Sequence, residues 1–231
     1  MTHCPSRPRL CLLNPNANAA TTAMMTAIAN EAAQGQALFV GQTMASGPSI
    51  ITDEQALEAA GPQIVAAGRA AAASGCAGIL ISGFGDPGLE ALRRAIAIPV
   101  TGIAEASMAV ASAGGRRFSV VTTTPNLMAA ITRTAERYGC LDALASLRIT
   151  PGDAEETMSD PEALARALLA LCHDAVAIDG AQAIIIGGGP LAIAARTIAH
   201  DIPVPLIEPV DAGAALALRR ALEWPAVGAR R

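Results

Sequence analysis

The 231-residue sequence contains no lysine, since all sixteen of its basic residues are arginine. Without a lysine amine the chain cannot form a Schiff base, which excludes pyridoxal phosphate enzymes and class I aldolases. P-loop nucleotide-binding proteins are excluded as well, because their phosphate loop needs a lysine. Twenty acidic residues give a formal net charge of −4. We therefore expect no nucleic-acid partner, because no basic stripe is present to neutralise phosphates.

Aromatic residues, long apolar runs and paired cysteines are also scarce. One Trp, one Tyr and three Phe are too few to build stacking platforms for single-stranded nucleic acids. No apolar run reaches the roughly 18 residues of a membrane span, and the first apolar stretch is too short for a signal peptide. The cysteines show no CxxC pair and no histidine at ligand spacing: Cys4, Cys11, Cys76, Cys140 and Cys172. This pattern predicts reduced thiols in a soluble, cytoplasmic protein with no membrane partner.

Short runs of Val, Ile and Leu alternate with longer alanine-rich segments, which predicts an α/β fold of βαβ units with parallel sheets. Strands are expected at residues 10–14, 36–43, 77–82, 99–102, 117–123, 183–187 and 204–207. Helices are expected at residues 19–34, 53–74, 89–95, 104–113, 126–138, 160–178, 191–199 and 211–222. The second helix is expected to break at Gly61-Pro62, because proline removes an internal N–H donor.

The chain also repeats itself. Residues 75–83 align with residues 180–188, and each segment is followed by a helical stretch and an Ile-Pro-Val triplet. Residues 10–16 likewise resemble residues 118–126. This duplication predicts two pseudo-symmetric lobes with a cleft between them. We expect the first lobe to contain residues 1–115 with 210–231, and the second to contain residues 116–209.

Polar turns follow the central strands of both predicted lobes, at residues 14–16, 82–88, 122–126 and 187–190. Because ligands bind at the C-terminal ends of parallel strands, we expect these turns to converge on one cleft. The turn at Gly187-Gly188-Gly189-Pro190 lacks the GxGxxG pattern of a dinucleotide site. A carboxylate, an enolate or an imide-like ring fits better, because hydrogen-bond donors stand in both lobes: Asn14, Asn16, Ser82, Thr122, Thr123 and Thr124. For each threonine, capping the next helix is an equally good explanation.

Six segments, in order along nearly the whole chain, resemble the aspartate/glutamate racemase superfamily. They are residues 14–16 (NPN), 47–48 (GP), 81–89 (ISGFGDPGL), 99–106 (PVTGIAEA), 118–123 (FSVVTT) and 180–188 (GAQAIIIGG). The FGDPGL stretch is similar to the hydantoin racemase branch. The resemblance implies two lobes around an active-site cleft, a small-molecule substrate, no metal and no cofactor, and a homo-oligomer. Phe84, Gly187 and Gly189 would then contact the substrate, and Met44 is a further candidate for the cleft wall.

Racemases of this superfamily use two cysteines on opposite faces of the substrate, one as base and one as acid. By the resemblance, those positions are Gly83 and Gly188 in this chain, and glycine cannot transfer a proton. The missing side chains are expected to enlarge the cleft. Cys76 and Cys172 are expected to be buried apolar residues instead of replacements. The related arylmalonate decarboxylase also has glycine at the first position, but it keeps the second cysteine as the proton donor.

Three functional hypotheses therefore stay open. We favour a lyase in which Ser82, Thr122 and neighbouring donors stabilise an enolate made by bond cleavage. The alternatives are a racemase-like isomerase with displaced acid–base residues, and a non-catalytic ligand-binding member. In the last case the glycines are natural or were introduced by engineering.

No convincing acid–base pair is present elsewhere in the sequence. Glu105 and Glu208 follow strands, where each either points into the cleft or anchors a helix N-terminus. Asp86 is expected to cap its own helix. The remaining candidates are expected on helix surfaces or near helix ends: Tyr138, His173 and His200.

Overall fold

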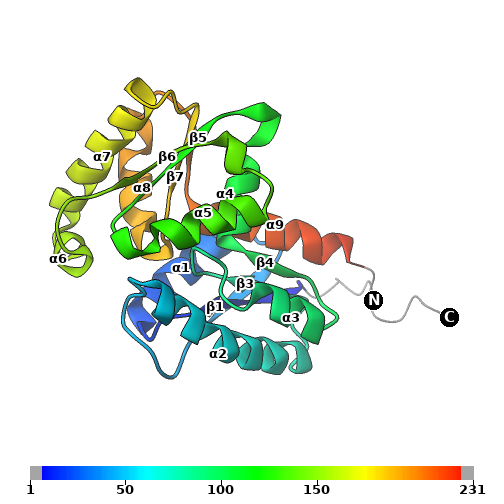
Figure 1. The fold of residues 1–231 in the computed structure, drawn as a ribbon. Coiled ribbons are helices and arrows are strands. Elements are labelled where there is room, and N and C mark those ends of the chain that lie inside the picture. The colour runs from blue at the N-terminus through cyan, green and yellow to red at the C-terminus, as the bar shows by residue number, and fades with distance from the viewer. Residues whose placement is uncertain (1–6, 225–231) are drawn as a thin grey trace.

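The computed structural model describes residues 7–224, which form two four-stranded parallel sheets surrounded by helices (Figure 1). The first sheet has the strand order β2-β1-β3-β4, with β1 Arg9–Asn14, β2 Leu38–Thr43, β3 Gly78–Ile81 and β4 Val100–Gly102. The second has the order β6-β5-β7-β8, with β5 Phe118–Thr122, β6 Leu144–Ile149, β7 Ala183–Ile186 and β8 Leu206–Ile207. The predicted α/β class with parallel sheets is confirmed.

The helices are α1 Ala19–Ala32, α2 Glu54–Ala73, α3 Leu89–Ala95, α4 Ile103–Ala111, α5 Met128–Arg137, α6 Ala154–Ser159, α7 Pro161–Ala177, α8 Ala192–Ile198 and α9 Pro209–Glu223. Several begin at a side chain that accepts the first backbone N–H groups, such as Asn18 at α1, Asp53 at α2 and Asp160 at α7. Figure 1 shows the two sheets in separate halves of the molecule, with α5 and α9 lying between them.

The sequence analysis expected no element between residues 139 and 159, where β6 and α6 are found. Every residue of β6 is only partly buried, and α6 has just six residues. Neither element therefore carries a long apolar run or a full helical period, which are the signals that sequence patterns depend on.

The predicted break at Gly61-Pro62 is wrong, because α2 continues through Pro62. An interior proline costs about 3 kcal/mol, so packing must offset this cost. Gly61 allows the backbone of Gly88 to approach closely, and Gly68 lies directly against Leu92 of α3. Packing of the buried face of α2 against Gly88 and α3 thus stabilises the helix across Pro62.

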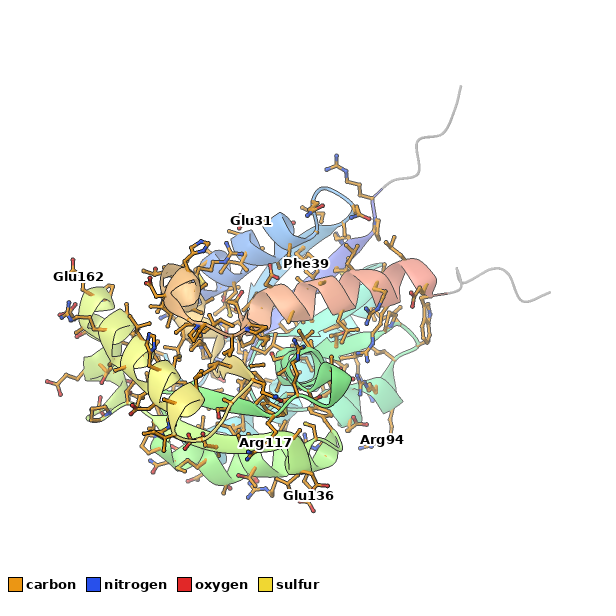
Figure 2. All side chains as sticks on the ribbon, turned by 90° about the horizontal axis from the view of Figure 1, so that it is seen from above. Glu31, Phe39, Arg94, Arg117, Glu136 and Glu162 are labelled. Atoms are coloured by element: carbon orange, nitrogen blue, oxygen red, sulfur yellow. The ribbon has the colours of Figure 1, made fainter. Side chains whose placement is uncertain are left out.

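The strands at the centre of each sheet are mostly apolar. All residues of β3, β5 and β7 are buried, as expected for strands covered by helices on both faces. Figure 2 shows charged side chains such as Glu31, Arg94 and Glu162 at the outside of the molecule. Among the described residues, no helix is long and apolar enough to cross a membrane. The cytoplasmic location stays a prediction, and residues 1–6 (with Cys4) and 225–231 lie outside the described part of the first predicted lobe.

Candidate active site

A pocket of about 60 Å³ lies where four turns from the two sheets meet. Residues 15–16 follow β1 and residues 82–84 follow β3, while residues 122–124 end β5 and residues 187–190 follow β7. The structure therefore brings the four predicted turns together. Apolar side chains complete the wall: Ile50, Ile51, Leu57, Leu127, Met158 and Leu191. The sequence analysis missed these residues, because they carry no motif and come from loops and helices outside the repeat.

All of the predicted site residues except Asn14 line this pocket, namely Asn16, Ser82, Gly83, Phe84, Thr122, Thr123, Thr124, Gly187, Gly188 and Gly189. The Asn14 side chain is fully buried, and its Nδ2 donates to Asn16 Oδ1 at 2.8 Å and to Thr22 Oγ1 at 2.9 Å. Asn14 therefore holds the turn that carries Asn16 instead of facing a ligand. Met44 is buried in the core of the first sheet and does not line the pocket.

The hydroxyl groups in the pocket are not equally free to bind a ligand. Ser82 Oγ donates to Leu13 O at 3.0 Å, and Thr122 Oγ1 donates to Gly187 O at 2.7 Å. These two protons are therefore already used to fix the turns. Among the described residues, the hydroxyl of Thr123 meets only Met158 Sδ, at 3.7 Å, and a thioether sulfur is a weak acceptor. Thr123 thus has the most available hydroxyl of the pocket.

Backbone groups add further donors. Among residues 7–224, the N–H groups of Gly83, Phe84 and Gly189 donate no backbone hydrogen bond within the chain. They border the same pocket, from the turns that follow β3 and β7. Unpaired N–H groups at the edge of a pocket can bind a carboxylate or stabilise an oxyanion.

The described residues that line the pocket include no Asp, Glu, His, Cys, Tyr or Arg. The four described cysteines are free and buried, as predicted for Cys76 and Cys172. Burial raises the pKa of Cys11 and of Cys172 to about 12, so neither is a thiolate near neutral pH. No group of three His, Cys, Asp or Glu residues within the described chain is arranged to hold a metal ion.

Glu105 and Glu208 are both engaged away from the pocket. Glu105 accepts hydrogen bonds from Arg93 at 2.7 and 2.9 Å and from Arg220 at 2.8 Å. Burial by itself raises the pKa of Glu105, but the bonds from the two arginines outweigh it and lower the pKa. Glu208 caps α9 by accepting from the N–H groups of Val210 and Asp211. Of the two sequence alternatives, the structure supports the helix anchor for Glu208. Glu105 accepts from the N–H of Gly102 at the start of α4 only at 3.5 Å, and its short hydrogen bonds come from the two arginines.

Asp86 does not cap its own helix, so that prediction is wrong. Its carboxylate accepts from the N–H groups of Ala104 at 3.0 Å and Glu105 at 2.8 Å, which begin α4, and from Tyr138 Oη at 2.6 Å. Helix α3 begins at Gly88 without a side-chain cap. His173 and His200 are exposed, as expected, and neither lines the pocket.

Gly83 and Gly188 differ in the room they leave for a side chain. An ideal Cβ on Gly83 would lie 2.5 Å from Pro15 Cγ, whereas one on Gly188 would lie 3.5 Å from Leu191. The φ angle of Gly188 is 157°, a value that L side chains rarely adopt. The expectation that both missing side chains enlarge the cleft is therefore wrong at Gly83, where the proline ring fills the space.

Residues 10–217 match the protein family described as Asp/Glu/Hydantoin racemase. The chain belongs to this family. Its relatives include the hydantoin racemase of Pseudomonas sp. (strain NS671), which is 31% identical over 205 residues, 89% of this chain and 82% of the relative. The hydantoin racemase of Rhizobium meliloti is 33% identical over 213 residues, 89% of this chain and 86% of the relative.

Solved structures show the same racemase-family fold. The allantoin racemase from Klebsiella pneumoniae is 30% identical with a TM-score of 0.84, covering 91% of this chain and 86% of that one. Unliganded arylmalonate decarboxylase is 18% identical with a TM-score of 0.63, covering 94% of each chain. The expected fold is therefore confirmed, and the solved structures that share it include both a racemase and a decarboxylase.

Proposed function

We propose that this racemase-family protein is a cofactor-independent lyase of the decarboxylase type, acting on a small molecule that carries a carboxylate next to a second carboxylate, carbonyl or imide-like group. The observation that carries the proposal is that no described residue lining the pocket has an acidic or basic side chain. Inversion of a carbon requires a base on one face and an acid on the other. Decarboxylation needs no base, because the carbanion forms when the bond to the departing carboxyl group breaks.

The proposed reaction is balanced by water. The C–C bond to the carboxylate breaks, carbon dioxide leaves, and the electron pair remains on the substrate as an enolate. The N–H groups of Gly83, Phe84 and Gly189 and the hydroxyl of Thr123 would stabilise the enolate oxygen. Ser82 and Thr122 would hold these donors in place through their own bonds to carbonyl oxygens. A water molecule then delivers the proton to the α-carbon, and the hydroxide that remains combines with the released carbon dioxide to give bicarbonate.

The packing at Gly83 supports the hypothesis that glycine is the natural residue at this position. By resemblance, Gly83 and Gly188 stand where racemases carry their two cysteines. An engineered replacement of cysteine would leave a gap, whereas Pro15 already occupies the position of the missing Cβ at Gly83. We therefore favour natural glycines, and with them a reaction that does not depend on thiols.

The pocket also restricts the substrate. Its volume of about 60 Å³ is far below the roughly 300–1,000 Å³ of pockets for drug-sized ligands. Its donors come from the turns of both sheets, and the apolar side chains of Ile50, Ile51, Leu57 and Met158 complete its wall. We infer a compact substrate with one anionic or polar end and one small apolar group.

A ligand-binding protein without chemistry is the second candidate, and the same lack of acidic and basic side chains favours it. NMR in deuterated water with 5-substituted hydantoins, acidic amino acids and arylmalonates separates the possibilities. The lyase is supported by loss of carbon dioxide with one deuteron entering the α-carbon. Deuterium exchange without loss of mass would instead establish an isomerase. Thermal stabilisation without conversion would establish a binding protein.

Variants sharpen this experiment. Thr123→Val removes the free hydroxyl at nearly constant volume, and we expect a 10- to 100-fold lower kcat if that hydroxyl stabilises the enolate. Thr132→Val is the matched control, because Thr132 is a partly buried residue of α5 that lies outside the pocket and whose hydroxyl donates to Met128 O. Equal rates for the two variants would remove Thr123 from the proposed mechanism.

A further inference from the structure

A buried carboxylate stands directly behind the pocket wall. Asp86 is 2% exposed and lies in the loop that also carries the pocket residues Gly83 and Phe84. Its own N–H donates to Gly83 O at 2.9 Å, which closes the loop into a turn. The φ angle of Asp86 is 53°, in the left-handed region that non-glycine residues seldom occupy. The position of the pocket wall is therefore tied to the position of this one carboxylate.

The carboxylate bonds to elements on both sides of the molecule. The N–H groups of Ala104 and Glu105 reach it from α4, which follows β4 of the first sheet. The hydroxyl of Tyr138 reaches it from the end of α5, which follows β5 of the second sheet. In Figure 1, α5 runs between the two halves, which is where such a bond can join them.

The carboxyl group of Asp86 and the loop around it are tightly packed. Gly102, at the start of α4, has no side chain, and a Cβ there would overlap the carboxyl group of Asp86. On the other side of the loop, a Cβ on Gly88 would lie 2.8 Å from Gly61 O of α2. The loop of residues 83–88 is thus packed between α2 and α4. The hydrogen bond between Asp86 and Tyr138 connects this loop to the half of the molecule that contains the second sheet.

We propose that Asp86 and Tyr138 form a buried latch that holds the Gly83–Gly88 wall of the pocket in a fixed position relative to the second sheet. The latch fixes the positions of the Phe84 ring, the Gly83 N–H and the Phe84 N–H relative to the turn at Gly187. Phe84 already reaches that turn, because its Cε1 would lie 3.4 Å from a Cβ on Gly187. Asp86 and Tyr138 are therefore positioning residues, and the proposal does not depend on which reaction the pocket supports.

Other charged groups near the latch are paired or lie at its edge. Glu105 faces Asp86 from α4, but its charge is balanced by Arg93 and Arg220. From α5, Arg133 pairs with Glu54 of α2 at 2.7 Å. Glu58 of α2 and Arg137 of α5 also border the cavity beside Asp86. None of these groups replaces the hydroxyl of Tyr138 as a hydrogen-bond donor to the carboxylate.

Tyr138→Phe tests the latch, since it removes one hydroxyl and keeps the ring. Hydrogen–deuterium exchange at pH 8 should be faster in residues 83–88 and 104–105 by about tenfold, the effect of losing one buried hydrogen bond. Asp86→Asn should have a similar effect in the same segments. Glu208→Gln is the matched control, because Glu208 is also a buried carboxylate that caps a helix but has no partner in the pocket loop. It should speed exchange only near residues 210–211.

A second measurement separates a latch from simple packing. The hydrogen bond from Tyr138 lowers the pKa of Asp86 against the larger effect of burial, so removing the hydroxyl should raise that pKa further. The pH midpoint of the Asp86-dependent change in unfolding stability should then move upward in Tyr138→Phe. An unchanged midpoint, or exchange in residues 83–88 that is the same as in the wild type, would overturn the proposal. Equal acceleration by Glu208→Gln would overturn it too.

Discussion

Raising the pH from 5 to 7 should ionise the buried carboxyl group of Asp86 and thereby destabilise this protein. Burial raises the pKa of Asp86 from 3.8 to about 6, and hydrogen bonds from Tyr138, Ala104 and Glu105 offset only part of this effect. A carboxyl whose pKa is higher in the folded state binds its proton more tightly there than in the unfolded chain. Its contribution to stability is therefore present at low pH and is lost as the pH rises through about 6.

The magnitude follows from the shift in pKa. One pKa unit corresponds to about 1.4 kcal/mol, so a rise from 3.8 to about 6 is about 3 kcal/mol over the whole titration. Between pH 5 and pH 7 the contribution of Asp86 falls by about 1.3 kcal/mol. The effect is large enough to measure against a typical total stability of about 5–15 kcal/mol.

Urea unfolding followed by circular dichroism at pH 5, 6 and 7 is the assay, with Asp86→Asn as the reference. The variant has no carboxyl at this position, so the difference between the two pH profiles isolates Asp86. This subtraction matters because burial also raises the pKa of Glu208, which adds a change of the same sign. Parallel profiles for the wild type and Asp86→Asn between pH 5 and 7 would refute the reasoning.

Three further predictions concern Glu105, which binds Arg93 and Arg220, and the pocket glycines Gly83 and Gly188. Glu105→Gln should lower the free energy of unfolding by about 2 kcal/mol in urea titrations, because Arg93 and Arg220 lose their shared carboxylate. Gly83→Ala should cost about 1–3 kcal/mol and displace the pocket wall, because the added methyl meets Pro15. Gly188→Ala should also cost about 1–3 kcal/mol, but through backbone strain at a φ angle of 157° instead of a steric clash, because the added methyl would lie 3.5 Å from Leu191. Unchanged stability in both variants would contradict the assigned packing.

The sequence predicted the repeated strand–turn–helix units well, because their signals are local. A buried strand that ends in a polar turn can be recognised from residues such as Leu10–Asn16 or Ile81–Gly88 alone. The common edge of parallel strands then implies that such turns meet, and the pocket brings them together. Local signals were weak for β6 and α6, and neither element was predicted.

The roles of individual polar side chains were harder to predict, because their partners are distant in the sequence. Asp86 bonds to Ala104, 18 residues away, and to Tyr138, 52 residues away. Glu105 meets Arg220 across 115 residues. A capping side chain looks the same in the sequence whether it caps its own helix or another one, so the prediction for Asp86 was wrong and that for Glu105 stayed open.

The sequence by itself therefore determined the class of fold, the turns that line the pocket and the absence of cysteine from two of them. Only the tertiary structure decided that no residue of the described chain lining the pocket is acidic or basic, that Pro15 fills the space at Gly83, and that Asp86 connects both halves. The physical reason is that covalent neighbours fix strands and turns. Space, burial and hydrogen-bond partners are instead fixed by residues that meet only when the chain folds.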